Sequence, residues 1–403
     1  MFIKNKLFYL FILSFFVSCT IQNSDSSLSG INNDIDSLKN IYAPDTRIAL
    51  WNILIEDNEN KVTITAEVDN EKAKADLLKT LSSKYPDIDL TVNLLPEKKT
   101  NSMALVNNSV CNIRDEACHS AELVNQVLLG KPVKLLKKED GWYLIQTPNQ
   151  YIGWVKSSEI VRFDSTSLKE YKTTKKIIFN KQYGFSYTLP DSKSQIVTDL
   201  VVGCILPVIG NKKKFYKVKY PDNRVAFVKK DEVVDIDLFI NKKPEENGLV
   251  NTAKKFIGIP YLWGGSSSKS IDCSGFTSNI YFLNGIIIQR DASQQVKYGK
   301  EITTSYDYTD LLPGDLLFIG RRANDSLPEK VTHVIMYIGD SEFIHASSTF
   351  GNVKINSMDS TRANYFPGYV SSFIKTIRII GEENGSTIEK ITNNKFYKTI
   401  ISE

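Results

Sequence analysis

The sequence predicts a multidomain protein with a small N-terminal α/β unit, two small β-barrels and a C-terminal α+β domain. Its 403 residues exceed what one domain of about 100–200 residues usually holds. A weak repeat of short strands and turns fills residues 101–240, and after a polar linker, 241–247, the pattern changes to a helix followed by a meander of strands. With 42% hydrophobic and 24% charged residues the composition is globular, which excludes a wholly disordered, collagenous or multi-span membrane protein. The net charge is only +4, and no basic cluster is interleaved with aromatics, so no nucleic-acid partner is expected.

The N-terminus has the pattern of an export signal. Lys4 and Lys6 precede an apolar run, Leu7–Val17, which is too short for a membrane-spanning helix of about 20 residues. Residues 1–18 are therefore predicted to be a signal peptide. Cys19 follows the small Ser18, which resembles the lipobox of bacterial lipoproteins; ordinary cleavage beside a stray cysteine is the alternative. The resemblance implies a lipid anchor at Cys19, a flexible tether over 19–43, and an exported protein on the membrane of the cell envelope.

Residues 44–100 are predicted to form the small α/β unit. Strands are expected over Arg47–Ile55, Val62–Val68 and Ile88–Leu95. A helix is expected over Asn70–Lys84, whose apolar residues Ala73, Leu77, Leu78 and Leu81 share one face. No chemistry is evident in this unit, so its role is expected to be packing, spacing or protein contact.

Residues 101–163 and 164–240 are the two copies of the repeat. The first ends Tyr-Ile-Gly-Trp-Val-Lys-Ser-Ser-Glu-Ile-Val and the second Arg-Val-Ala-Phe-Val-Lys-Lys-Asp-Glu-Val-Val. Short strands separated by turns favour small barrels. Together with Gly141-Trp142, the first copy resembles bacterial SH3 domains, and the second is a weaker match that lacks the Gly-Trp pair. In that family such barrels flank cell-wall enzymes and help to bind substrate.

Residues 246–382 are predicted to form the α+β domain. Helices are expected over Leu249–Phe256 and Ile271–Asn284, and strands over Leu316–Ile319, His333–Ile338 and Glu342–His345. The remaining residues, 383–403, read as a polar, loosely ordered tail.

Cys273 is the candidate nucleophile of this third domain. It opens the second predicted helix, and the positive end of a helix dipole favours the thiolate, which is the nucleophilic form. A cysteine nucleophile needs a base and a group that orients the base. The chain has only three histidines, and two of them, His333 and His345, flank a predicted hairpin at Gly339-Asp340-Ser341. Pairing about that turn brings both rings to one face, with His333 as base and His345 holding its tautomer. Zinc is a weak rival use, because no Cys-x-x-Cys or His-x-x-x-His pair is present.

The order and spacing of the motifs in this domain resemble the NlpC family of papain-like cell-wall peptidases. The matching segments are Gly258-Ile-Pro-Tyr-Leu-Trp-Gly-Gly265, Asp272-Cys-Ser-Gly275, Arg290-Asp291, Leu312-Pro-Gly-Asp-Leu316, Thr332-His-Val334 and His345-Ala346. The resemblance implies a papain-like α+β fold that uses no metal or organic cofactor. It assigns Cys273 as nucleophile, His333 as base, His345 as the third polar residue and Tyr261 as an oxyanion donor. It also places Trp263, Asp272 and Ser274 in the substrate groove. Asp272 can instead be only a helix N-cap, Trp263 only a core residue, and Arg290 and Asp291 either substrate ligands or partners of each other.

With SH3 barrels in front, the chain looks like the subgroup that cuts between γ-D-glutamate and a diamino acid in peptidoglycan stem peptides. That subgroup recognises a free L-alanine amine with acidic and aromatic groups of the first barrel, and Glu122 and Tyr151 fit by position and chemistry. Cys111 and Cys118, nearby, can form a disulfide in an oxidising compartment. Two alternatives remain at this point: an amidase or acyltransferase on the same fold, and a non-catalytic wall-binding lipoprotein.

Overall fold

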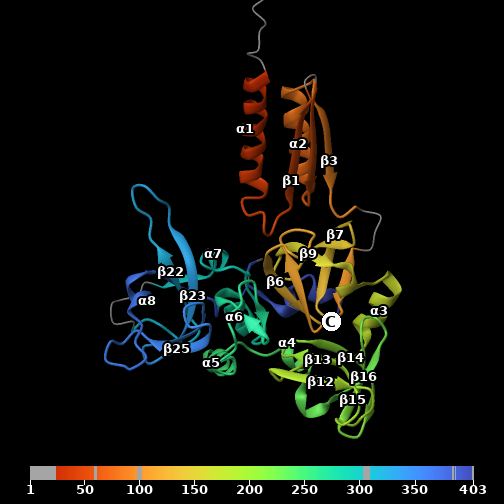
Figure 1. Cartoon of the computed structure of the whole chain (residues 1–403), viewed down its shortest axis with the longest axis vertical. Coiled ribbons are helices and arrows are strands. Elements are labelled where there is room, and N and C mark those ends of the chain that lie inside the picture. Colours follow the sequence, from red (N-terminus) through yellow and green to blue (C-terminus); the bar gives the residue numbers. More distant parts are fainter. Residues whose placement is uncertain are drawn as a thin grey trace, which may run out of the picture. The chain divides into compact units, whose positions relative to one another are not determined.

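The computed structural model of the chain describes residues 24–58, 61–97, 102–302, 309–383, 385 and 387–401 (Figure 1). The predicted signal peptide and Cys19 lie outside these residues. Within the described ranges, no helix combines the length and the apolar character needed to cross a membrane. The chain divides into two compact units, one holding residues up to Pro44 and Trp51–Asn93, the other Asp45–Leu50 and the residues from Leu94 onward.

The first unit is a three-stranded antiparallel sheet with two helices. Its elements are α1 (Ser24–Tyr42), β1 (Trp51–Asn58), β2 (Lys61–Val68), α2 (Glu71–Lys84) and β3 (Asp89–Leu94), with strand order β1-β2-β3. The Asn70 side chain caps α2 by accepting from the backbone N–H groups of Lys72 and Ala73, and α1 packs against α2.

The flexible tether predicted over 19–43 is therefore wrong from Ser24 onward, where α1 begins. The apolar residues Leu28, Ile31, Ile35 and Leu38 recur every three to four positions. Ile31 and Ile35 are buried, so this stripe gives the helix a packed face despite its many Ser, Asn and Asp residues.

Two seven-stranded barrels follow, and the sequence repeat is a repeat of structure. The first contains β4 (Met103–Val106), β5 (Val110–Arg114), β6 (Leu123–Leu128), β7 (Pro132–Glu139), β8 (Trp142–Gln146), β9 (Ile152–Lys156) and β10 (Ile160–Arg162). The second contains β11 (Lys176–Phe179), β12 (Tyr183–Tyr187), β13 (Ile196–Val201), β14 (Ile205–Lys212), β15 (Phe215–Lys219), β16 (Val225–Lys229) and β17 (Val233–Asp235). In both, the hairpin of the repeat pairs an aromatic residue with a lysine, Trp142 with Lys156 and Phe215 with Lys229, and a 3₁₀ turn follows. Helices α3 (Ser165–Thr173) and α4 (Ile236–Ile240) precede and follow the second barrel.

The C-terminal domain is a six-stranded antiparallel sheet with a helix packed on it. The strand order is β21-β26-β22-β23-β24-β25. The strands are β21 (Lys300–Ile302), β22 (Leu316–Arg321), β23 (Lys330–Gly339), β24 (Glu342–Ser347), β25 (Asn352–Ser357) and β26 (Phe373–Arg378). Helix α6 (Cys273–Phe282) packs against β23 and β24, and its buried Phe276 and Ile280 share a core with Val334 and Ile344 (Figure 1). The other helices are α5 (Glu246–Lys254), α7 (Ala292–Gln295) and α8 (Pro367–Ser371), and short strands β18 (Ser266–Ser267) and β19 (Ser270–Ile271) lead into α6.

The C-terminal tail is not loosely ordered, which corrects the expectation for 383–403. Strand β27 (Glu389–Lys390) pairs with β20 (Ile286–Ile287), and two 3₁₀ turns follow it. The buried apolar residues of the tail are Ile388, Ile391, Phe396, Tyr397, Ile400 and Ile401. These apolar side chains bury enough surface to fix a segment whose overall composition is polar.

Candidate active site

Cys273 is the first residue of α6, and the residue before it holds the start of the helix in place. Asp272 is the N-cap, and its carboxylate accepts a hydrogen bond from Gly275 N–H at 2.7 Å. The thiol is only 7% exposed, and burial raises its pKa to about 12, although the nearby N–H groups of Val334 and Ser274 act in the opposite direction. Burial thus opposes the helix terminus, which by itself favours the thiolate. Activation of the thiol depends on a base that accepts its proton.

The structure brings His333 and His345 together through the register of the β23–β24 hairpin. Met336 lies opposite Ile344 and Tyr337 opposite Phe343, and Asp340 and Ser341 form the turn with φ of 52° and 59°. This register makes the two histidines diagonal neighbours on one face of the sheet. Nε2 of His333 lies 2.8 Å from Nδ1 of His345.

A buried asparagine that the sequence reasoning missed extends this contact into a relay. Asn356, on β25, donates through Nδ2 to the carbonyl of Asn364 at 3.0 Å, so its Oδ1 faces Nε2 of His345 at 3.3 Å. Burial lowers the pKa of His333 to about 3 and that of His345 to about 4, so each neutral ring carries one proton. Since Asn356 Oδ1 can only accept, His345 is protonated at Nε2 and accepts from His333 Nε2–H. The basic nitrogen of His333 is then Nδ1.

Tyr369, on α8, is a second residue that the sequence did not single out. Its ring stacks on His333 with centroids 5.1 Å apart and planes 19° apart, and it meets His345 edge to face at 5.1 Å. The ring therefore covers the base and restricts its rotation. Tyr261, bridged to Ile271 just before the nucleophile, is half-buried; burial raises its pKa, and the neighbouring Cys273 adds to that rise. Its hydroxyl is thus a neutral hydrogen-bond donor beside the thiol.

Arg290 is an interior residue that ties the N-cap of α6 to the rest of the molecule. The residue is 1% exposed, and its guanidinium makes a bidentate ion pair with Asp272 at 2.6 and 3.0 Å. It also donates to the Ser274 hydroxyl at 3.1 Å, while Asp291 lies farther away at 3.8 Å. Because Gly264 N–H also binds Asp272, at 2.9 Å, both oxygens of this carboxylate are occupied. The contacts of Asp272, Ser274 and Arg290 therefore fit positioning of the nucleophile rather than direct lining of a groove.

The other predicted residues lie where the first barrel, with Glu122 and Tyr151, meets the loop that carries Trp263. Trp263 is 62% exposed rather than a core residue, and its indole N–H donates to the Glu122 carboxylate at 2.5 Å. Tyr151 is 4% exposed, and burial together with the nearby Asp291 carboxylate raises the pKa of its hydroxyl. Gly264 has φ of +76°, and a Cβ there would lie 2.1 Å from the Leu123 carbonyl, so only glycine lets this loop approach the barrel so closely.

Cys111 and Cys118 are not paired in the structure. Cys111 is fully buried in the first barrel and donates to Glu159 at 2.9 Å, whereas the Cys118 sulfur lies 3.4 Å from the Ser120 hydroxyl. Among the residues that the structure describes, no group of three or more His, Cys, Asp or Glu side chains is placed to hold a metal ion.

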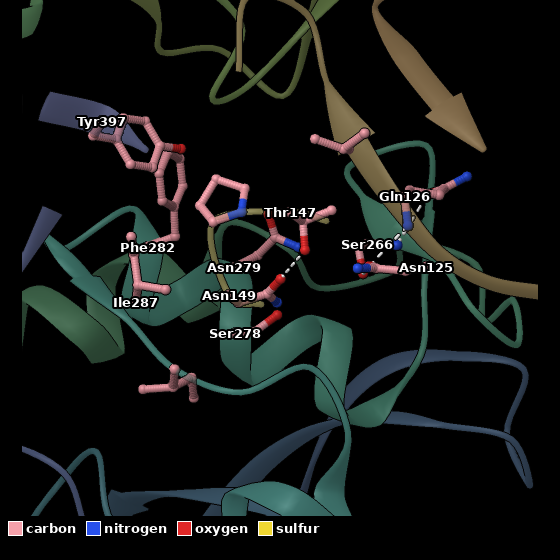
Figure 2. Close-up of a pocket in the computed structure, with 13 residues that line it drawn as sticks. Asn125, Gln126, Thr147, Asn149, Ser266, Ser278, Asn279, Phe282, Ile287 and Tyr397 are labelled. Atoms are coloured by element: carbon pink, nitrogen blue, oxygen red, sulfur yellow. Dashed lines mark hydrogen bonds between the residues drawn. The ribbon is translucent and has the colours of Figure 1, made fainter. Parts of the chain in front are cut away.

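A small cavity of about 60 Å³ lies on the far half of α6, away from the thiol (Figure 2). Its walls come from the first barrel, from α6 and from the C-terminal tail, with Tyr397 beside Phe282. Asn394 of the tail donates to the Pro148 carbonyl of the barrel at 3.0 Å. This region is a seam between the barrel and the domain that carries Cys273.

A thiol at a helix N-terminus, a histidine on the facing strand and a polar group behind that histidine define a papain-like cysteine hydrolase. Comparison with known proteins identifies two of the domains. Residues 258–367 match the NlpC/P60 family, and residues 108–161 match the bacterial SH3 domain. The chain is a cysteine peptidase with an NlpC/P60 domain and a bacterial SH3 domain.

The relatives and solved structures agree with this assignment. The "Gamma-D-glutamyl-L-lysine dipeptidyl-peptidase" of Bacillus cereus is 29% identical over 265 residues, which cover 62% of this chain and 74% of the relative. "Dipeptidyl-peptidase 6" of Lysinibacillus sphaericus is 28% identical, over 69% of this chain and 98% of the relative. The crystal structure of an NlpC/P60 family protein from Bacillus cereus matches with a TM-score of 0.56 and 24% identity, over 69% of this chain and 99% of that one. That last likeness shows the fold.

Proposed function

We propose that this protein hydrolyses the γ-D-glutamyl–diamino acid bond of peptidoglycan stem peptides, in fragments with a free N-terminal L-alanine. The observation that carries the proposal is the placement of Cys273 and the His333–His345 pair in one domain, with the exposed Glu122 of the first barrel hydrogen-bonded to Trp263 of that domain. Relatives that span most of this chain are named for cleavage beside γ-D-glutamate, and they support this choice of bond.

The reaction begins with transfer of the Cys273 proton to Nδ1 of His333 as the thiolate attacks the γ-carbonyl carbon. The carbonyl oxygen becomes an oxyanion, held by the Cys273 backbone N–H and the Tyr261 hydroxyl. His345 stabilises the imidazolium because its Nδ1 accepts a hydrogen bond from His333 Nε2–H. Asn356 fixes the orientation of His345.

Collapse of the tetrahedral intermediate breaks the C–N bond, and His333 returns its proton to the departing amine of the diamino acid. The acyl group remains on sulfur as a thioester. His333 then deprotonates a water molecule, which attacks the thioester, and Cys273 leaves and recovers its proton. The products are the γ-D-glutamyl peptide and the diamino acid fragment.

The substrate lies in the bacterial cell wall, so the protein is expected in the cell envelope. We propose that residues 1–18 direct export and that lipid on Cys19 holds the protein at a membrane. Metabolic labelling with an alkyne-tagged fatty acid tests the anchor. Label on the wild-type protein and none on Cys19→Ala is expected; a wild-type protein that takes up no label would contradict it.

The catalytic proposal is tested with L-Ala-γ-D-Glu-diaminopimelate tripeptide, the protein lacking residues 1–19, and mass spectrometry of the products. Release of L-Ala-γ-D-Glu by the wild type and none by Cys273→Ala is expected. Cys273→Ser is the matched control, since it replaces the thiol with a hydroxyl of similar size, and it should also release no product. Products whose new ends are not γ-D-glutamate and the diamino acid amine would instead identify an amidase or acyltransferase.

A further inference from the structure

Tyr369 contacts the predicted base from outside the segments that match known families. It belongs to the short helix α8 and lies just beyond residues 258–367, the range that matches the NlpC/P60 family. Its ring stacks on the His333 imidazole with centroids 5.1 Å apart and planes 19° apart, and it meets His345 at 5.1 Å with the planes nearly perpendicular. The structure therefore places the face of an aromatic ring along the base, a contact that the sequence motifs do not encode.

Two sets of contacts hold the Tyr369 ring in this position. Its neighbours Phe366 and Phe343 pack on it with ring centroids 4.6 Å and 5.6 Å away. The residues that follow β24 approach its hydroxyl: burial raises the pKa of Tyr369, and the side chains of Ser347 and Thr349 act in the opposite direction. Since the ring is packed at its edges and approached at its hydroxyl, it stays at a fixed distance from the base.

Separation of charge at this site is costly because both reacting groups are buried. Burial raises the pKa of the Cys273 thiol to about 12 and lowers that of His333 to about 3, so transfer of the proton from sulfur to His333 is unfavourable in the resting site. His345 helps, because it accepts from His333 Nε2–H, but Lys354, opposite His345 on β25, adds positive charge nearby. A neighbour that stabilises the imidazolium without a charge of its own would lower this cost.

We propose that Tyr369 is a positioning residue whose ring stabilises the imidazolium form of His333, so that the proton of Cys273 can move to Nδ1 of His333 and leave a thiolate. An aromatic ring attracts a cation that lies over its face within about 6 Å of the centroid, and the attraction grows when water is excluded. The stacked pair meets that distance. The inference rests on the proposed function, in which His333 takes the Cys273 proton. Because the ring and not its hydroxyl stacks on His333, phenylalanine should replace Tyr369 without loss.

The test measures the rate at which iodoacetamide alkylates Cys273 as a function of pH, by mass spectrometry of the peptide that carries Cys273. Only the thiolate reacts, so the rate reports the fraction of Cys273 that has given up its proton. Tyr369→Leu should lower the rate at neutral pH about 5- to 30-fold and shift the profile to higher pH, since an apolar side chain replaces the ring. Tyr369→Phe should stay within twofold of the wild type. Phe366→Leu, which removes a ring packed on Tyr369 rather than on His333, is the matched control and should leave the profile unchanged.

Alkylation of the partly exposed Cys118 in the same samples is the internal standard and should be equal in every variant. An unchanged Cys273 profile in Tyr369→Leu would overturn the inference. An equal loss in Tyr369→Phe would assign the effect to the hydroxyl and would overturn it too. A lower rate at every pH without a shift of the profile would make Tyr369 a structural residue only.

Should Tyr369→Leu fail to fold, phenylalanine carrying one, two or three fluorines at position 369 decides. Fluorine weakens the attraction of the ring face for a cation and barely changes the size of the ring, so the rate should fall with each fluorine; a flat series would overturn the inference. Alkylation needs no peptide substrate. A wild type that cleaves no tripeptide but follows these profiles would therefore refute the proposed function and retain the role of Tyr369.

Discussion

The two barrels have the same strand order but make different contacts with the peptidase domain. In the first, β6 lies against the residues that lead to the nucleophile: Asn125 accepts from Arg290 at 2.9 Å, and Gln126 accepts from Ser266 N–H at 2.9 Å. In the second, the matching strand β13 reaches the same domain through Asp199, which pairs with the half-exposed Lys269 at 2.7 Å. The next strand, β14, contacts the first barrel: Ile205 N–H of β14 donates to the Leu129 carbonyl of the first barrel at 2.9 Å. A barrel thus takes part in the site through the side chains on one strand, and the fold alone does not assign that role.

The largest expected difference is between Arg290, a buried arginine of the peptidase domain that contacts the first barrel, and Arg224, an exposed arginine of the second barrel. Arg290→Met should destabilise the protein by about 3–5 kcal/mol and abolish peptidase activity, because Asp272 would remain buried without its cation. Arg224→Met, in the second barrel, removes an exposed pair with Asp222 and should cost about 0–1 kcal/mol. Chemical denaturation measures both. Similar losses in the two variants would contradict the distinction between the barrels.

Matched substitutions on the equivalent strands give the next largest effect. Asn125→Leu should cost about 1–3 kcal/mol, since it leaves the Nε–H of buried Arg290 and the Ser266 hydroxyl without their acceptor. It should lower kcat more than it raises KM, because the change reaches Cys273 through Asp272. Asp199→Asn on β13 keeps an acceptor for Ser109 and loses a partly exposed ion pair, so about 1 kcal/mol or less is expected. If Asp199→Asn lowers kcat as much as Asn125→Leu, the second barrel also positions the nucleophile.

The sequence predicted the parts of the site that have a local signature. A cysteine at a helix start, two histidines spaced about a tight turn and a repeated strand-turn pattern can each be read within a dozen residues, and the structure places them as that spacing implies. Asn125, Tyr369 and Arg47 have no such signature, because each acts through a partner far along the chain. Arg47 and Asp291, for example, form an ion pair and are 244 positions apart. Asn356 lies only 11 positions from His345, but a single asparagine in a strand has no pattern that marks it. Helix α1 and the C-terminal tail were missed for another reason: sparse apolar residues fix segments whose average composition is polar.

The pH dependence of stability should come from the peptidase domain rather than from the barrels. Burial lowers the pKa of His333 to about 3 and of His345 to about 4, so the unfolded chain, with histidines near 6.5, binds protons that the folded state does not. The contribution of the two histidines to the free energy of unfolding is therefore fully present above about pH 6.5. It decreases as the pH falls below that value, by about 2 kcal/mol per histidine at pH 5.

Chemical denaturation at pH 7.5 and pH 5 measures this slope, which is the change in the free energy of unfolding with pH. The double variant His333→Gln/His345→Gln should lose most of it. His119→Asn, which changes the exposed histidine of the first barrel, is the matched control and should retain the slope. A slope that survives the double variant would place its origin in the carboxylates instead.

The smallest expected effect is the change in KM caused by removing the charge of Glu122, and the exposure of this carboxylate determines its size. Glu122 is exposed and already accepts from Trp263, so its pairing with a substrate ammonium is screened by water and should be worth about 0.5–1 kcal/mol, or two- to fivefold in KM. Glu122→Gln keeps an oxygen acceptor for the indole and removes only the charge. It should raise KM for the free-amine tripeptide and leave the acetylated form unchanged. Asp231→Asn, an exposed carboxylate of the second barrel, should change neither value. A loss of tenfold or more in Glu122→Gln would mean that the substrate desolvates the carboxylate, and that the first barrel contributes most of the preference for a free amine.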